Sequence, residues 1–275
     1  VIIGGAKGIP HKSRNRESNH RTDPELWQTA KDLIEAKYPD FGPTFAHEKL
    51  TEIHGLKIGE AAVRNLMIAE KIWTPEKRKK NKQYRCQRER KSSFGEMIQF
   101  DGCYHLWLED RGKEYCLLSG IDDATDKPVK LEFADSESVL DVFAYWKEYI
   151  KQYGKPVAIY LDKYSTYKIN HKSAKDNHEL LTQFQRACKE LDIGLITAHS
   201  PQAKGRVERP FFTFQDRLVK DMRLQNISTV EDANKFLKDF WTEDYGKRFG
   251  VAPKSKTDLH RKLSGKELAN LDAIF

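Results

Sequence analysis

Residues 97–101 read Met97-Ile98-Gln99-Phe100-Asp101, a stretch in which apolar and polar side chains alternate as they do in a half-buried β-strand. Two more strands are expected behind it, at residues 105–108 and 115–121, and Asp110-Arg111-Gly112-Lys113 between them is typical of a hairpin turn. Residues 129–133 extend the same pattern. Short strands joined by turns predict that a β-sheet begins here.

Downstream of these strands, helical and strand-like patterns alternate. The expected elements are, in order, an amphipathic helix from 136 to about 153, a buried strand at 157–161, a helix at about 177–191, a strand at 193–197, and helices at roughly 206–223 and 229–245. Hairpin strands followed by this order predict an α/β domain, a mixed sheet flanked by helices. We expect this domain to span residues 95–250.

Ahead of the sheet, residues 23–74 are predicted to form a small all-α domain. Asp23-Pro24-Glu25 combines an N-cap, a first-turn proline and an early acid, and apolar residues recur after it at helical spacing. Two short helices are expected next, at 44–55 and 60–72. Two such helices joined by a short turn resemble a helix-turn-helix, whose second helix reads DNA.

The candidate reading helix carries Arg64 and Asn65 on the side that its apolar residues leave to solvent. We therefore predict that these two side chains contact DNA. A small helical bundle that binds nothing is the alternative that the pattern leaves open.

The formal net charge of the 275-residue chain is +7, and the positive charge is concentrated in one segment. Nine basic residues and one acid lie between residues 77 and 91, so this segment carries +8 and the rest of the chain −1. A local excess of this kind indicates a polyanionic partner. We interpret residues 75–94 as a basic linker that follows a DNA backbone, with Lys79, Lys80 and Arg85 as candidate contacts. A solvated spacer is the alternative.

Composition excludes several classes of protein. No uninterrupted apolar run exceeds five residues, whereas a membrane helix needs about 20, so we expect no membrane span. The four cysteines make neither a disulfide framework nor a zinc site, which indicates a reducing compartment, the cytoplasm.

The ends of the chain carry their own expectations. We expect residues 1–22 to be a poorly ordered arm. Because the chain begins at Val1 without a methionine or a leader, we expect it to be a piece of a longer protein. Residues 251–275 are polar, and we predict that they form a truncated C-terminal extension.

Three carboxylates stand out by their position in the predicted elements. Asp101 closes the first strand, Asp162 follows the buried strand, and Glu208 lies near the start of a helix. Adjacent strands can bring the first two within a few ångströms, and the helix can bring the third to face them. Three crowded carboxylates repel unless a cation compensates, and oxygen ligands select Mg²⁺ or Mn²⁺. A second acidic group, Asp122, Asp123 and Asp126, is expected in a solvated turn.

Three blocks of this sequence resemble the catalytic blocks of DDE transposases. They are Ile98-Gln99-Phe100-Asp101-Gly102, Leu161-Asp162-Lys163-Tyr164-Ser165 and Ser200-Pro201-Gln202-Ala203-Lys204-Gly205-Arg206-Val207-Glu208-Arg209. More narrowly, they resemble the integrase-like core of bacterial insertion-sequence transposases of the ISNCY type, and the resemblance covers roughly residues 40–250. The chain departs from the pattern in two places. Asp162-Lys163-Tyr164 stands where Asp-Asn-Gly is more widespread, and Pro210 is unusual two residues after the glutamate.

This resemblance implies a ribonuclease-H-like fold, with a mixed five-stranded sheet flanked by helices and preceded by the helix-turn-helix domain. It implies two Mg²⁺ or Mn²⁺ ions, with Asp101 bridging both, Asp162 binding one and Glu208 the other. Such a site nicks the ends of an insertion element to free 3′-OH groups and joins them to target DNA.

The same resemblance implies the partners. They are double-stranded DNA, as the terminal inverted repeats and the target, and further copies of the chain assembled on DNA in the bacterial cytoplasm, at the nucleoid. Basic side chains beside the acids are candidate DNA contacts, or else ordinary surface charges: Lys163, Lys204, Arg206 and Arg209.

Two other functions remain open at this point. One is a ribonuclease-H-like nuclease that hydrolyses DNA without strand transfer, and the other is a catalytically dead, transposase-derived DNA-binding protein. A lost carboxylate would favour the second, and all three acids are present.

Overall fold

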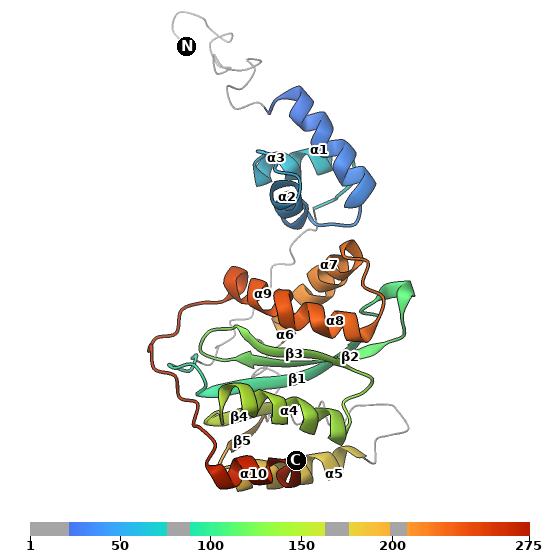
Figure 1. Ribbon diagram of the computed structural model, residues 1–275. Helices are drawn as coiled ribbons and strands as arrows, with labels where there is room; N and C mark the ends of the chain where they lie inside the picture. Colours follow the sequence, from blue (N-terminus) through green and yellow to red (C-terminus); the bar gives the residue numbers. More distant parts are fainter. Residues whose placement is uncertain (1–21, 76–88, 163–175, 199–207) are drawn as a thin grey trace, which may run out of the picture. The chain divides into compact units, whose positions relative to one another are not determined.

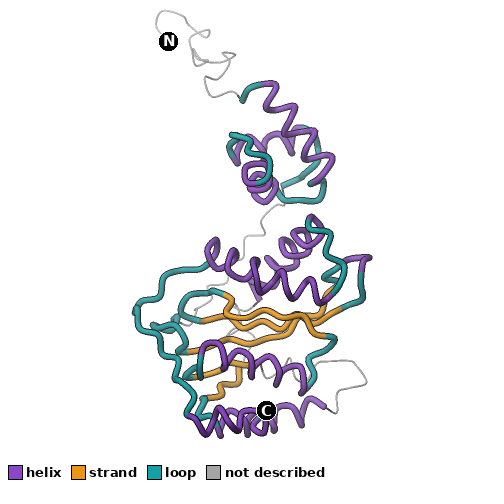
Figure 2. Tube along the Cα trace, viewed as in Figure 1, coloured by secondary structure: helices purple, strands orange, loops and turns teal. Residues whose placement is uncertain are grey.

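The computed structural model describes residues 22–75, 89–162, 176–198 and 208–275. The chain divides into two compact units, residues 1–82 and 83–275, each of which is described by itself. Figure 2 shows helices and loops but no described strand in the first unit, and a sheet between helices in the second. In the described ranges, no helix has the length and apolar character needed to cross a bilayer. The predicted arm and most of the predicted basic linker lie outside the described residues.

The first unit contains three helices, as the sequence predicts. They are α1 (Pro24–Lys37), α2 (Pro43–Glu52) and α3 (Glu60–Ala69). The carboxylate of Asp23 accepts the N–H of Glu25 at 2.8 Å, and Pro24 opens the first turn of α1, so the predicted cap is confirmed.

Apolar side chains from all three helices form the core of this unit. Ile34 of α1, Leu50 of α2 and Leu66 of α3 are completely buried. Polar contacts join the same helices at the surface, since Lys31 Nζ lies 2.6 Å from a Glu70 carboxylate oxygen beyond α3. Burial of one face of each helix stabilises the unit and leaves the other faces in water.

The second unit is built on a five-stranded mixed sheet. Its strands are β1 (Met97–His105), β2 (Tyr115–Asp122), β3 (Pro128–Ala134), β4 (Ala158–Asp162) and β5 (Gly194–Ala198), in the spatial order β3-β2-β1-β4-β5. The first three pair antiparallel, and β4 pairs parallel to both β1 and β5. This is the mixed five-stranded, ribonuclease-H-like sheet that the resemblance implies, and the predicted fold class is confirmed.

Helices cover both faces of the sheet (Figure 1). One face packs against α4 (Val139–Tyr153), α5 (Asp176–Glu190) and α10 (Gly265–Ile274). The other packs against a chain of helices, which are α6 (Glu208–Thr213), η4 (Phe214–Leu218), α7 (Val219–Leu224), α8 (Val230–Phe236), η5 (Leu237–Trp241) and α9 (Thr242–Phe249). The five-residue segments η4 and η5 are π-helical turns that continue the α-helices on either side.

Two local predictions in the antiparallel region are wrong. Residues 105–108 do not form a separate strand, because β1 continues through His105 and pairs with β2 as far as His105↔Tyr115. The connection to β2 contains a 3₁₀ turn, Glu109–Arg111, in place of a simple hairpin turn. The apolar character of Trp107 and Leu108 reflects their burial in the core between the sheet and α6–α9, and not a strand.

The acidic turn after β2 is structural and buried, contrary to the expectation of a solvated loop. Asp122 and Asp123 are completely buried. Asp122 accepts hydrogen bonds from the N–H groups of Gly95 and Thr125 and from the Thr125 hydroxyl, at 2.7–3.0 Å. Asp123 accepts the N–H of Lys91 at 2.7 Å. These acids therefore hold residues 91–95, which precede β1, against the turn between β2 and β3.

Residues 251–275, which we predicted to be an extension beyond the core, pack against the sheet domain. Leu271 and Ile274 of α10 are buried in the same cluster as α4 and α5. Lys155 after α4 also forms an ion pair with Glu267 of α10, with 2.5 Å between Nζ and Oε1. This segment is part of the second unit.

Candidate active site

The backbone brings two of the three predicted carboxylate positions together. In the parallel pair of β1 and β4, Phe100 lies opposite Leu161. Asp101 and Asp162 each follow that pair by one residue, at the point where the pairing ends. Neighbouring strands are about 4.8 Å apart. The register therefore places these two residues side by side, Asp101 within β1, which continues to His105, and Asp162 at the carboxyl end of β4.

Asp101 is half-buried and shapes the electrostatics of its surroundings. One of its carboxylate oxygens accepts the N–H of Gly102 at 3.1 Å. Burial, and then the negative charges of Asp101 and Glu114, raise the pKa of the Cys103 thiol. Cys103 therefore stays protonated near neutral pH, and the negative charge at this end of β1 belongs to the carboxylate.

The helical segment that begins at Glu208 contacts β1 through Gln215 of η4. The side-chain amide of Gln215 donates a hydrogen bond to Cys103 Sγ at 3.4 Å. Cys103 is two residues past Asp101, so both side chains lie on one face of the strand. Glu208 is seven residues before Gln215, about two helical turns. The helix that carries the third acid thus starts on the face of the sheet to which Asp101 belongs.

Pro210 does not disrupt this helix. It is the third residue of α6, in the first turn, where backbone N–H groups have no partner within the helix. Its side chain is buried. The departure from the family pattern at this position is therefore compatible with an intact α6.

The remaining predicted site residues fall into two groups. Arg209 is exposed on α6, and Arg64 and Asn65 are exposed on α3, as predicted for side chains that meet DNA. The others lie outside the described residues, and they are Lys79, Lys80, Arg85, Lys163, Lys204 and Arg206.

The structure describes the backbone of Asp162 and Glu208 but not their side chains. Among the side chains that it does describe, no three acids, histidines or cysteines come together as metal ligands. Whether these residues suit a metal ion is therefore judged from the type of ligand atom that they supply and from the positions of their backbones. Two adjacent aspartate positions and a nearby glutamate position supply oxygen donors alone, which suits Mg²⁺ or Mn²⁺.

Two side chains near Asp101 are not among the predicted site residues. Gln99, two residues earlier on β1, is 2% exposed and donates to the Asp123 carboxylate through its amide. Its amide oxygen has no hydrogen-bond partner among the described residues. Gln215 is the second, and the sequence offers a signal for it, because it begins the segment Gln215-Asp216-Arg217-Leu218-Val219-Lys220, which is typical of the transposases that the chain resembles.

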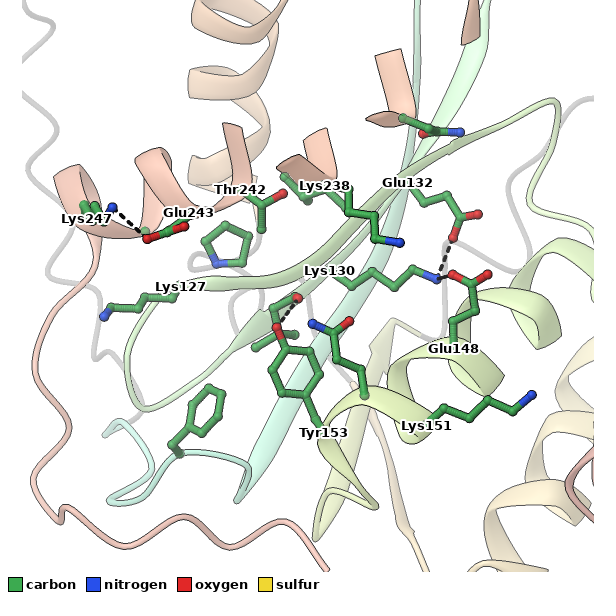
Figure 3. Close-up of a pocket in the computed structure, with 17 residues that line it drawn as sticks. Lys127, Lys130, Glu132, Glu148, Lys151, Tyr153, Lys238, Thr242, Glu243 and Lys247 are labelled. Carbon is green, nitrogen blue, oxygen red and sulfur yellow. Dashed lines mark hydrogen bonds and ion pairs between the residues drawn. The ribbon is translucent and has the colours of Figure 1, made fainter. Parts of the chain in front are cut away.

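A separate cavity of about 840 Å³ lies along the edge strand β3, between α4 and the helices η5 and α9 (Figure 3). At its centre, Lys130 forms ion pairs with Glu132 and Glu148 at 2.8 and 2.7 Å. Among the residues that the structure describes, its lining includes none of the predicted site residues.

Two curated relatives of the chain are named as transposases. No family model matches the chain. It is 42% identical over 264 residues, 96% of its length, to y4bF of Sinorhizobium fredii, a protein to which a transposase function is assigned by inference. It is 29% identical over 284 residues, 90% of its length, to the transposase for insertion sequence IS1202 of Streptococcus pneumoniae. These matches cover 57% and 59% of the two relatives, so the chain spans little more than half their length.

Two solved structures to which the chain is similar are retroviral. The catalytic core domain of HTLV-2 integrase in complex with magnesium matches 52% of this chain and 83% of its own, with a TM-score of 0.39 and 19% identity. A simian T-cell lymphotropic virus intasome in complex with the PP2A regulatory subunit B56 gamma matches 85% of this chain and 80% of its own, with a TM-score of 0.44 and 17% identity.

The similarity to these relatives extends along almost the whole chain. Over 96% and 90% of its length, the chain is homologous to two proteins that are named as transposases, one of them the transposase of an insertion sequence.

Proposed function

We propose that this chain is a DDE transposase, which nicks the ends of an insertion element to free 3′-OH groups and joins them to target DNA. The observation that carries the proposal is the register of β1 and β4, which sets Asp101 and Asp162 in adjacent positions. Its homology to insertion-sequence transposases selects DNA as the substrate.

Asp101, Asp162 and Glu208 would hold two divalent cations, Mg²⁺ or Mn²⁺. When bound, such ions supply activation of the attacking oxygen and charge stabilisation of the leaving oxygen in phosphoryl transfer. Without a cation the three carboxylates would repel one another, and they would also repel the phosphodiester. The fixed backbone of β1 and β4 keeps two of these ligands at a constant separation, which favours a preorganised site.

Arg209 is the described cation nearest in sequence to Glu208, and it is exposed on α6. We assign it to the phosphate beside the scissile bond, where a guanidinium can bind two oxygens at once. The unit of α1–α3 would bind the terminal inverted repeats, with Arg64 and Asn65 of α3 as the reading residues. Two element ends must be brought together, so we expect more than one copy of the chain on the DNA.

The test is cleavage of labelled DNA that carries the element's own ends, in Mg²⁺ or Mn²⁺. We expect metal-dependent 3′-OH products from the unchanged protein and none from Asp162→Ala. Asp239→Ala is the matched control, because Asp239 is an exposed carboxylate on η5 and its removal changes the net charge by the same amount. Equal loss of cleavage in both variants would contradict the assignment of Asp162.

A pre-cut DNA with a free 3′-OH separates the transposase from a nuclease of the same fold. The transposase joins this strand to a second DNA, whereas a nuclease gives hydrolysis products only. Specific binding of element ends without cleavage would instead indicate a catalytically dead DNA-binding protein.

A further inference from the structure

Helix α6 leaves one of its phenylalanines in water. Phe211 is buried and Phe214, the next residue after the helix, is completely buried, but Phe212 is 72% exposed. Phe212 has no ring or cation contact with another described residue. Other exposed aromatic side chains in this unit are partnered, since Phe249 lies 4.7 Å from the ring of Tyr245 and Phe240 lies 5.6 Å from the ring of Phe236.

The position of Phe212 on α6 relates it to the candidate active site. It follows Glu208 by four residues, and residues four apart lie on the same side of a helix. It precedes Gln215 by three residues, and Gln215 contacts Cys103 on β1. The exposed ring therefore lies on the side of the helical segment that carries Glu208 and Gln215.

A cation accompanies this ring. Arg209 precedes Phe212 by three residues and is also exposed, so the two side chains are neighbours on the surface of α6. An aromatic face beside a guanidinium matches the two components of a nucleotide, because the ring stacks on a base while the cation binds a phosphate.

We propose that Phe212 is a positioning residue that stacks on an unpaired base beside the scissile phosphate, while Arg209 binds the adjoining phosphate. The inference rests on the proposed function and deepens it. A DNA strand whose phosphate reaches the carboxylates on the adjacent inner strands β1 and β4 separates locally from its complement, and a stacked base holds the separated DNA strand in place. Every base has a π-face, so this contact tolerates changes of sequence.

The experiment uses the full chain with Asp162→Ala to prevent cleavage, and element-end DNA with 2-aminopurine beside the scissile phosphate. We expect a low fluorescence in this complex, because the base is stacked on the ring. Adding Phe212→Ala should raise the fluorescence several-fold and weaken binding about tenfold, the usual order for loss of one base stack. Phe212→Trp should restore both values.

Phe240→Ala is the matched control, since Phe240 is 54% exposed on η5, and it should leave both values unchanged. Unchanged fluorescence and affinity in Phe212→Ala would overturn the proposal, as would a large fall in its melting temperature, which would show that the ring is packed within the protein. The proposed function fails separately, through absence of metal-dependent cleavage by the protein with Asp162 intact.

Discussion

The side-chain amide of Gln215 donates to the thiol sulfur of Cys103, 3.4 Å away, and so connects the helical segment that begins at Glu208 to the strand that carries Asp101. Both partners are partly buried, and Cys103 packs against the core between the sheet and the α6–α9 helices. The contact is weak as a hydrogen bond, because sulfur is a poor acceptor. Its importance is positional. Cys103 is two residues from the predicted ligand Asp101, and Gln215 is about two helical turns from the predicted ligand Glu208.

We predict that Gln215→Ala lowers the rate of DNA cleavage about tenfold and leaves the affinity for element ends unchanged. Loss of the amide allows α6 to shift against β1, and small displacements of catalytic groups reduce the rate strongly. Single-turnover cleavage and a binding isotherm measure the two quantities. Gln225→Ala, which removes an exposed amide at the end of α7, is the control and should behave as the unchanged protein.

Pro210→Ala should leave both cleavage and stability nearly unchanged. The missing N–H of a first-turn proline loses no bond within the helix, so we expect a change of less than about 1 kcal/mol in the free energy of unfolding. Urea denaturation and the cleavage assay test this. A large gain of cleavage in Pro210→Ala would show instead that the proline damages the site.

Arg64→Ala should weaken binding of the terminal repeats about tenfold, as expected for loss of one side chain that contacts a base or phosphate. In the free protein the Arg64 guanidinium lies 5.0 Å from the centre of the Trp73 ring, which limits its motion. Lys37→Ala removes one exposed positive charge at the end of α1 and serves as the control. Equal weakening by the two variants, measured at two salt concentrations, would argue against α3 as the reading helix.

The pair Lys155–Glu267 should make stability depend on pH. The Lys155 ammonium, followed by the N–H and hydroxyl of Ser264, lowers the pKa of Glu267 to about 2. This is below the value of about 4.3 in an unfolded chain. The contribution is therefore present above about pH 4.5 and is lost as the pH falls towards 2.

Glu267→Gln should accordingly reduce the free energy of unfolding by about 2 kcal/mol at pH 7, and the difference should shrink between pH 4.5 and 2. Urea denaturation at pH 7, 5 and 3 measures it. Glu243→Gln disrupts the exposed pair with Lys247 and should have little effect at any pH. A difference for Glu267→Gln that is independent of pH would show that its carboxylate is not the source.

Local patterns predicted individual elements well. Asp23 and Pro24 mark the start of α1 because a cap and a first-turn proline act within a few residues. The apolar run at 157–161 corresponds to β4, which is buried between β1 and β5. Asp101 was recognisable from its strand pattern, but the prediction that it closes the strand is wrong, because β1 continues to His105 and Asp101 lies within it.

The same patterns failed where distant residues decide the outcome. Trp107 and Leu108 looked like part of a strand, but they are apolar because α6–α9 cover them. Asp122 and Asp123 looked like a solvated turn, but backbone N–H groups from residues 91–95 meet them and compensate their burial.

The amino-acid sequence by itself determined the order and type of most helices and strands, the concentration of positive charge, and the three carboxylate blocks that resemble those of DDE transposases. Caps, periodicity and motifs act over a few residues and need no partner. Only the tertiary structure decided that Asp101 and Asp162 occupy adjacent positions, that Gln215 joins α6 to β1, and that residues 251–275 pack on the sheet domain. Parallel strand pairing and helix docking depend on contacts between residues far apart in the chain, and no local pattern specifies them.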